Sequence, residues 1–192
     1  MGTLPRRTRS RVLTLSALAP ALAAVGAPAG AAAGTETTAP STAHCVARAQ
    51  ALGTVTNGAQ PEVKCFATFA EALRSIGISV DLGTEPSQYA AIARSRTVGS
   101  GESFPYDVLA IHYRQGGTLS VFGTDCNGNG IPNLGTYGWN DAITATQNIR
   151  CGNVKHFRDI NYGDYAGSTT GYYTPPYAAP GSPYISSVAY FP

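Results

Sequence analysis

The chain has 192 residues, of which 43% are hydrophobic and only 12% are charged. A composition this poor in charge argues against a disordered, charge-swollen protein. The formal net charge is +2, but four of the 13 basic residues lie at Arg6, Arg7, Arg9 and Arg11, and every acidic residue lies at Glu36 or later. Without that start, nine basic residues face 11 acidic ones, a net charge of −2. Such a chain has no basic surface to attract nucleic acid or an anionic membrane.

The N-terminus predicts export. The basic start is followed by an apolar run from Val12 to Val25 and then by the small residues GAPAGAAAG. This order is typical of a secretory signal peptide, and the run is too short and too rich in Ala for a transmembrane anchor. We expect cleavage between about Ala29 and Ala33, so that residues 1–33 are removed and the protein is secreted. The Thr/Pro-rich residues 34–43 are predicted to be a linker.

A small segment with one short helix is expected over residues 44–98. Thr68 and Glu71 have the spacing of a capping box, in which a hydroxyl and a carboxylate satisfy backbone donors at the start of a helix. Apolar residues follow at helical spacing until Gly77. The helix is therefore predicted over about residues 69–76, between short strands or turns.

From residue 99 onward the sequence predicts short strands. The runs DVLAIHY, TLSVFG and ISSVAYF are separated by turn residues, as in an all-β sandwich or barrel. An internal repeat is also present, because Ala110–Arg114 reappears as Val154–Arg158, and Ala142–Ala145 reappears as Tyr184–Ser187. Two copies are too few for a solenoid, but they fit two Greek keys packed as a sandwich.

The four cysteines are Cys45, Cys65, Cys126 and Cys151, and no two of them form a CxxC pair. Zinc binding and thioredoxin-like chemistry are therefore poorly supported, whereas an even number of cysteines in an exported chain indicates disulfides. Three connectivities are possible. Nearness in sequence favours Cys45–Cys65 and Cys126–Cys151, each stabilising the fold by roughly 3 kcal/mol.

Three motifs resemble those of βγ-crystallin domains. GWNDAITA is similar to the calcium-site strand through Asn140, Asp141 and Thr144, with Ala in place of the final Ser. HFRDINYGDYAG is similar to the aromatic corner through Phe157 and Tyr162, with Asp where Gly is expected. SPYISSV is similar to the second calcium strand, but Ser and Pro replace its two Asn/Asp residues. The first aromatic corner, HYRQGGTLSV, is several residues short.

The resemblance covers about residues 103–192 and is closest to secreted bacterial members, which include small metalloproteinase inhibitors and killer-toxin-like proteins. It implies a mainly β fold in which two Greek-key motifs form a βγ-crystallin-like β-sandwich over residues 99–192. The small disulfide-bonded segment with its short helix would precede that sandwich. Residues 44–98 lie outside the resemblance.

The resemblance also implies calcium, in weak or vestigial sites. The better-kept site would use Asp141, the Ala142 carbonyl and Thr144, beside Asn140. The poorer one would use the Tyr184 carbonyl and the Ser186 hydroxyl, oxygens of the kind that calcium prefers. The alternative is a calcium-free domain in which Asp141 caps a turn. The sites expected from the resemblance comprise Asn140, Asp141, Ala142, Thr144, Tyr184 and Ser186.

A second oxygen-rich stretch, Asp125–Gly130, matches the start of an EF-hand loop. The twelfth position is Thr136 rather than a bidentate Glu, which favours a Gly/Asn turn held by Cys126 instead. Catalysis has less support, because the sequence contains neither HExxH nor GxSxG. His112 and His156 occupy equivalent positions of the repeat, which favours a shared structural position. No catalytic residues are predicted, and we do not expect an enzyme.

The segment GYYTPPYAAPGSPY, residues 171–184, combines tyrosines with prolines. Tyrosine gives a large amphipathic contact area, so this segment is either a binding loop for protein or glycan or a connection that covers the sandwich edge.

The function expected from these observations is a non-enzymatic, peptidase-inhibitor-like binding protein, monomeric, with a secreted protease as partner. The segment between Cys126 and Cys151 is the natural candidate for the presented loop. The alternative is a structural or killer-toxin-like extracellular protein that binds calcium, and a hydrolase with an unrecognised site is a weaker third possibility.

Overall fold

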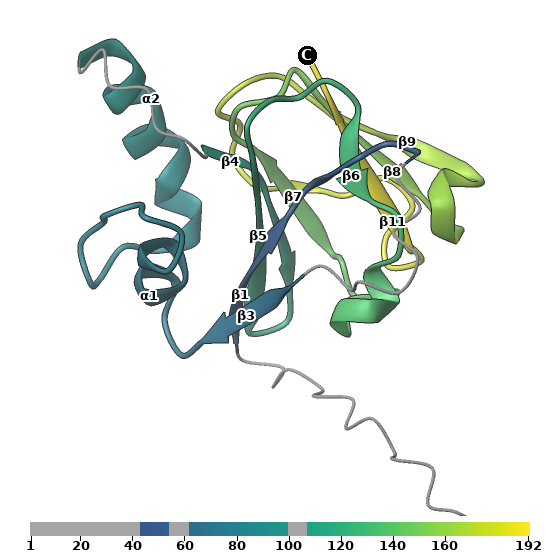
Figure 1. The fold of residues 1–192 in the computed structure, drawn as a ribbon, viewed down its shortest axis with the longest axis horizontal. Coiled ribbons are helices and arrows are strands. Elements are labelled where there is room, and N and C mark those ends of the chain that lie inside the picture. The colour runs from purple at the N-terminus through teal and green to yellow at the C-terminus, as the bar shows by residue number, and fades with distance from the viewer. Residues whose placement is uncertain (1–42, 54–61, 100–106) are drawn as a thin grey trace, which may run out of the picture. The chain divides into compact units, whose positions relative to one another are not determined.

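The structure, a computed structural model, describes residues 43–53, 62–99 and 107–192, and these residues are mainly β (Figure 1). The expected signal peptide and most of the linker lie outside the described residues. Eleven strands form two sheets. The mainly β class expected from the sequence is confirmed.

The first sheet has six strands, in the order β10 (Tyr177–Ala178), β7 (Ala145–Asn148), β4 (Asp107–Arg114), β5 (Gly117–Gly123), β1 (His44–Arg48) and β3 (Val63–Phe66). The second sheet has five, in the order β2 (Gln50–Ala51), β6 (Asn129–Ile131), β11 (Ser187–Phe191), β8 (Asn153–Phe157) and β9 (Tyr165–Thr170). Every pairing is antiparallel except that of β1 with β5.

The two copies of the repeat have matching topologies. In the first unit, β4–β7, strand β4 lies between β5 and β7, and β6 crosses to the other sheet. In the second unit, β8–β11, strand β8 lies between β9 and β11, and β10 crosses to the first sheet. This exchange of third strands is consistent with two packed Greek keys.

The N-terminal segment extends the sheet of the first unit. Strand β1 runs parallel to β5, with Cys45 opposite Leu119, and β3 pairs with the other edge of β1. Cys45 and Cys65 are register partners joined by a disulfide, and Cys126 is joined to Cys151, so both expected bridges are confirmed. Strands β1 and β3, which precede the boundary expected near residue 98, therefore belong to the same sheet as strands that follow it.

The side chains between the sheets follow the two-residue alternation of strands. On β5, Leu119 and Val121 belong to the cluster between the sheets, and Trp139, from the connection before β7, belongs to it as well. All three side chains are inaccessible to solvent. This cluster holds the two sheets together through burial of apolar surface.

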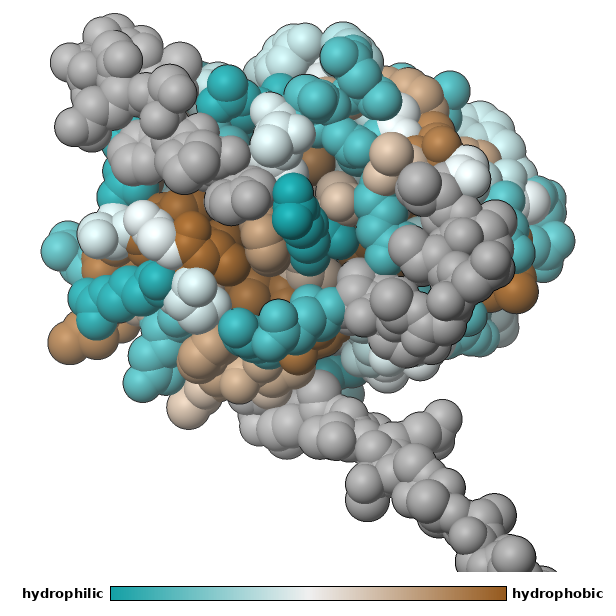
Figure 2. Space-filling view, viewed as in Figure 1, coloured by the Kyte–Doolittle hydropathy of each residue, from teal (hydrophilic) through white to brown (hydrophobic). Residues whose placement is uncertain are grey.

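Two helices cover the outer face of the six-stranded sheet (Figure 1). They are α1 (Phe69–Arg74) and α2 (Tyr89–Gly99), the latter preceded by the 3₁₀ turn η1 (Pro86–Gln88). Apolar side chains of these elements pack on Ile111 of β4. Figure 2 shows hydrophobic surface gathered where the two helices meet the sheet. Two further 3₁₀ turns are η2 (Leu134–Tyr137) and η3 (Ile160–Tyr162).

Helix α1 forms as the sequence predicts. The Thr68 hydroxyl accepts from Glu71 N–H at 3.2 Å, and the Glu71 carboxylate accepts from Thr68 N–H at 3.1 Å. At its end, Ile78 N–H donates to the Leu73 carbonyl across Gly77, whose φ is +85°. This Schellman-type ending needs a left-handed residue, which glycine adopts at no steric cost. Helix α2 was not predicted.

Candidate functional site

An interior polar chain of four side chains joins the two sheets: His112, Thr146, His156 and Tyr190. The Thr146 hydroxyl lies 2.9 Å from Nδ1 of His112 and 3.0 Å from Nε2 of His156. Nε2 of His112 lies 2.9 Å from the Tyr190 hydroxyl. His112 and Thr146 belong to the six-stranded sheet, and His156 and Tyr190 to the five-stranded sheet. All four side chains are fully buried.

Burial keeps both imidazoles neutral. Desolvation, with the neighbouring His156 adding to it, lowers the pKa of His112 from 6.5 to about 3. Desolvation lowers the pKa of His156 from 6.5 to about 4, against the opposing effect of the Gly167 backbone. The Gly167 backbone is near enough to raise the pKa of His156, but it does not meet hydrogen-bonding geometry. Among the described residues, Nδ1 of His156 therefore has no hydrogen-bond partner.

The equivalent histidines of the repeat thus share one structural position at the centre of the sandwich. The ring centroids of His112 and His156 are 6.2 Å apart, and the rings meet edge to face. A proton-transfer group must reach the substrate, directly or through one water, and these rings are sealed between the sheets. The arrangement suits a structural joint between the two units.

The expected calcium ligands lie on two adjoining segments. Asp141 N–H donates to the Ile185 carbonyl at 3.1 Å, which brings the segments before β7 and β11 together. Asp141 adopts a left-handed φ of 53°, and its carboxylate accepts from the Asn140 amide at 2.8 Å. Tyr184 is exposed, whereas Ser186 is buried.

These residues do not fit a dedicated calcium site. Calcium prefers six to eight oxygen ligands with several carboxylates, and Asp141 is the one carboxylate in this set. The other expected ligand oxygens are uncharged carbonyls and hydroxyls, and the Thr144 hydroxyl donates to the Tyr113 carbonyl at 3.1 Å. Among the described residues, no group of three or more His, Cys, Asp or Glu side chains is placed to hold a metal ion. Calcium binding stays a prediction, and the donor set favours a weak site.

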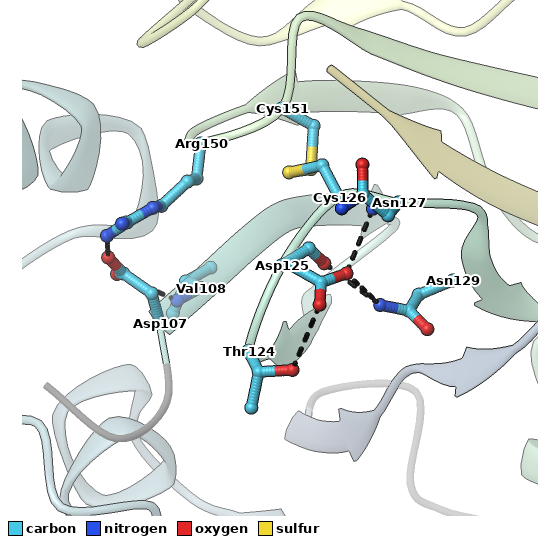
Figure 3. The surroundings of a disulfide bond; sticks show 9 residues. All are labelled: Asp107, Val108, Thr124, Asp125, Cys126, Asn127, Asn129, Arg150 and Cys151. Carbon is cyan, nitrogen blue, oxygen red and sulfur yellow. Dashed lines mark hydrogen bonds and ion pairs between the residues drawn. A yellow bond between two sulfur atoms is a disulfide. The ribbon is translucent and has the colours of Figure 1, made fainter.

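The EF-hand-like stretch forms a turn beside the second disulfide (Figure 3). The Asp125 carboxylate accepts from Asn127 N–H at 2.9 Å and from the Asn129 amide at 2.7 Å. A side chain that accepts from the backbone two residues on is an Asx turn. Nearby, Arg150 points away from the disulfide and forms an ion pair with Asp107. Asp125–Gly130 therefore forms the Asn/Gly turn that the sequence favoured over an EF-hand loop.

The segment between Cys126 and Cys151 is not a free presented loop. It contains strands β6 and β7 and the turn η2. Its apolar side chains, including Leu134, Trp139 and Ile143, are core residues of the sandwich. Its exposed residues are scattered in short polar stretches, namely Asn127, Gly135, Thr136, Gly138, Asn140, Asp141, Thr144 and Arg150. Burial of these apolar groups ties the segment to the fold and leaves little of it to enter another protein's cleft.

Residues 171–184, here called the tyrosine strap, run along the edge of the sandwich instead. Thr174 N–H donates to the Asn148 carbonyl at 2.8 Å, and Ala179 N–H donates to the Thr144 carbonyl at 3.1 Å. Between these points β10 pairs with β7. Further along, the strap passes so close to β9 that a Cβ on Gly167 would lie 2.5 Å from Pro180. The strap is therefore fixed to strands of both sheets.

Three tyrosines of the strap point to solvent. Tyr172, Tyr177 and Tyr184 are 55%, 51% and 64% exposed. The rest of each side chain is buried against the sandwich, so both sequence interpretations, a binding loop and a cover for the sandwich edge, stay predictions. Tyr173 behaves differently, because the Arg94 guanidinium lies 5.4 Å from its ring centroid and its φ is 52°. A bulky residue in the left-handed region is strained, and such strain persists only where the surroundings hold it.

A groove of about 640 Å³ lies between α2 and the strap. Ser87, Ala90, Ala91, Arg94, Ser95, Tyr173, Thr174 and Pro175 line it. Arg94 is the charged residue of this lining, which is otherwise apolar or hydroxyl-bearing. The sequence interpretation did not include this groove, because it is formed by a helix and a loop that are about 80 residues apart in the sequence.

The chain matches no family model, no curated protein and no solved structure. The two disulfides indicate a protein of an oxidising compartment. None of the helices in the described ranges is long and apolar enough to cross a membrane.

Proposed function

We propose that the protein is a secreted, non-enzymatic binding protein that contacts its partner through the tyrosine strap. One observation carries the proposal. Tyr172, Tyr177 and Tyr184 are each more than half exposed, yet the backbone between them is hydrogen-bonded to β7. Exposed aromatic groups on a fixed backbone are typical of a recognition surface rather than of a passive connection.

The energetics favour such a surface. Tyrosine buries a large amphipathic area at the cost of only two side-chain torsions. Because the strap is already ordered, little further conformational entropy is lost on binding. The prolines at 175, 176, 180 and 183 add to this order, since proline fixes φ and removes the backbone donor. The strap would therefore keep its shape against a partner.

The partner we propose is a secreted peptidase, which the protein would inhibit. The motif resemblance over about residues 103–192 supports this choice. The burial of apolar residues in the Cys126–Cys151 segment and the exposure of the strap tyrosines support the strap as the contact surface in place of that segment. The groove beside the strap offers space for one side chain of the peptidase. Arg94 complements a partner side chain that ends in a carboxylate.

The alternative function is a structural or killer-toxin-like extracellular sandwich that binds calcium. The two packed units and both disulfides suit that function equally well. The single carboxylate at Asp141 weighs against it.

The test is a titration of the mature protein against a thermolysin-like metallopeptidase and a subtilisin-like serine peptidase. Tyr177→Ala should weaken inhibition about 30-fold, which corresponds to roughly 2 kcal/mol at an interface hot spot. Tyr165→Ala is the matched control, because Tyr165 is also 55% exposed but lies on β9, outside the strap.

No inhibition of either peptidase at micromolar concentration would overturn the choice of partner. An equal loss in Tyr177→Ala and Tyr165→Ala would overturn the strap as the contact surface.

A further inference from the structure

The interior polar chain and the tyrosine strap share strand β7. Thr146 is the register partner of His112 on one side and of Tyr177, in the strap, on the other. Two residues further along β7, Asn148 N–H donates to the Thr174 hydroxyl at 2.9 Å, and Thr174 N–H donates back to the Asn148 carbonyl. A displacement of β7 from the five-stranded sheet would therefore displace the strap.

The hydrogen bonds within the interior polar chain are all satisfied when both rings are neutral, whereas two protonated rings would both donate to Thr146 and leave its own proton without an acceptor in the chain. Thr146 has one hydroxyl proton, so it donates to one imidazole and accepts from the other. Nε2 of His112 then accepts from Tyr190 or donates to it, according to the direction of the chain. An added proton places a positive charge among neutral hydroxyl groups in a sealed interior, where a charge is costly.

The groups packed against the two rings offer little to offset that charge. From β7 the neighbour is Thr146, from β11 it is Tyr190, and from β9 it is the backbone of Gly167. Each histidine faces the other across the two sheets. Tyr190 in turn interacts with Tyr137 of η2 and Tyr162 of η3. Apart from His156, which lowers the pKa of His112, no charged side chain among the described residues contributes to the pKa shift of either histidine.

We propose that the interior polar chain is an acid-sensitive switch, in which protonation of His112 and His156 separates β7 from the five-stranded sheet and frees the strap. The strap closes the side of the sandwich at which polar atoms lack partners among the described residues, namely the Asn148 amide and the Thr169 hydroxyl. Opening there would let water reach the charged rings. Release of a bound partner in acid also follows, but that consequence rests on the proposed function.

The direction of the effect follows from proton linkage. In the open state each histidine titrates near 6.5, whereas in the closed state protonation is delayed to about pH 4 for His156 and about pH 3 for His112. The closed state is thus fully favoured above pH 6.5 and loses its advantage as the pH falls through this window. With close to two protons taken up, the opening equilibrium constant should rise about 60-fold per pH unit between about pH 4.5 and 6.

The experiment follows unfolding in urea at a series of pH values, with Trp139 as reporter. Trp139 is the only tryptophan of the chain and is fully buried in the core between the sheets. His156→Gln keeps a group that can bond Thr146 but does not titrate, so the pH dependence should fall to about tenfold per pH unit. His44→Gln is the control, because His44 is only partly buried and lies outside the interior polar chain; burial lowers its pKa as well, so this variant should weaken the pH dependence, but by less than His156→Gln does.

The strap is monitored in the same samples by hydrogen-exchange protection of the Thr174 and Ala179 amides. Wild-type protection should drop with pH in parallel with the Trp139 signal, and His156→Gln should weaken that dependence.

An unchanged pH dependence in His156→Gln would overturn the proposal. If the variant does not fold, a ring-nitrogen NMR titration of the wild type decides, and titration of His112 or His156 near pH 6.5 in the folded protein would contradict it. These experiments use the protein without a partner, so a negative result would contradict the switch and leave the proposed function untouched.

Discussion

The two sides of strand β7 carry different kinds of side chain: buried hydrogen-bonded polar groups on one side and exposed tyrosines on the other. On the inner side, His112 and His156 both bond to Thr146, Tyr190 bonds to the other nitrogen of His112, and all four side chains are inaccessible to solvent. On the outer side, the strap carries uncharged residues, and three of its four tyrosines are more than half exposed. The reactive side chains are thus sealed, and the accessible ones are suited to contact. This contrast supports the binding function that we propose.

The largest loss of stability is expected when the interior polar chain is interrupted at Thr146. Thr146→Val keeps the shape of the residue but leaves one nitrogen of each histidine buried without a partner. Each unsatisfied buried group costs about 1–3 kcal/mol, so the free energy of unfolding should fall by about 4 kcal/mol in urea titrations. Thr144→Val is the control, since Thr144 is exposed, and its loss should stay below about 1 kcal/mol. Similar losses in the two variants would contradict a special role for the interior.

The disulfides give the next effect. Replacing Cys126 and Cys151 by Ala should lower the free energy of unfolding by about 3 kcal/mol, and replacing Cys45 and Cys65 by a similar amount, because the loops are of similar length, 25 and 20 residues. Neither change removes a histidine, so the pH dependence should stay as in the wild type. A weakened pH dependence would show that the linkage does not come from the interior polar chain.

Calcium should have a smaller effect. A site with a dissociation constant near 10⁻⁴ M would add about 1.4 kcal/mol at 1 mM calcium. With Asp141 as the one carboxylate, we expect the gain in a thermal melt to stay below that value, and Asp141→Ala to remove whatever gain there is. Ser186→Ala should matter less. A larger gain, or one that survives in Asp141→Ala, would require ligands other than those named.

The strap tyrosines should contribute least to stability. Tyr172→Ala and Tyr177→Ala remove side chains that are slightly more than half exposed, so the free energy of unfolding should fall by no more than about 1 kcal/mol. Their role is expected in binding alone. A loss of 2 kcal/mol or more in a urea titration would show that these side chains cover the sandwich edge after all.

The sequence was most informative where the pattern is local. The capping box at Thr68, the strand runs and the disulfide pairs by neighbourhood are all confirmed. Helix α2 was missed because its buried side chains are mainly alanines, so its apolar periodicity is weak. The partnership of Thr146 with both histidines depends on strand register, which composition does not reveal. The Cys126–Cys151 segment was taken for a loop because its core residues are spread between turns.

The central claim is that the strap, and not the Cys126–Cys151 segment, meets the partner. Hydrogen–deuterium exchange of the mature protein, alone and mixed with the inhibited peptidase, tests it most directly. We predict that the added protection is confined to residues 171–184 and the neighbouring part of α2. Added protection around Thr136–Asp141 with none on the strap would contradict it and return the contact surface to the disulfide-bounded segment.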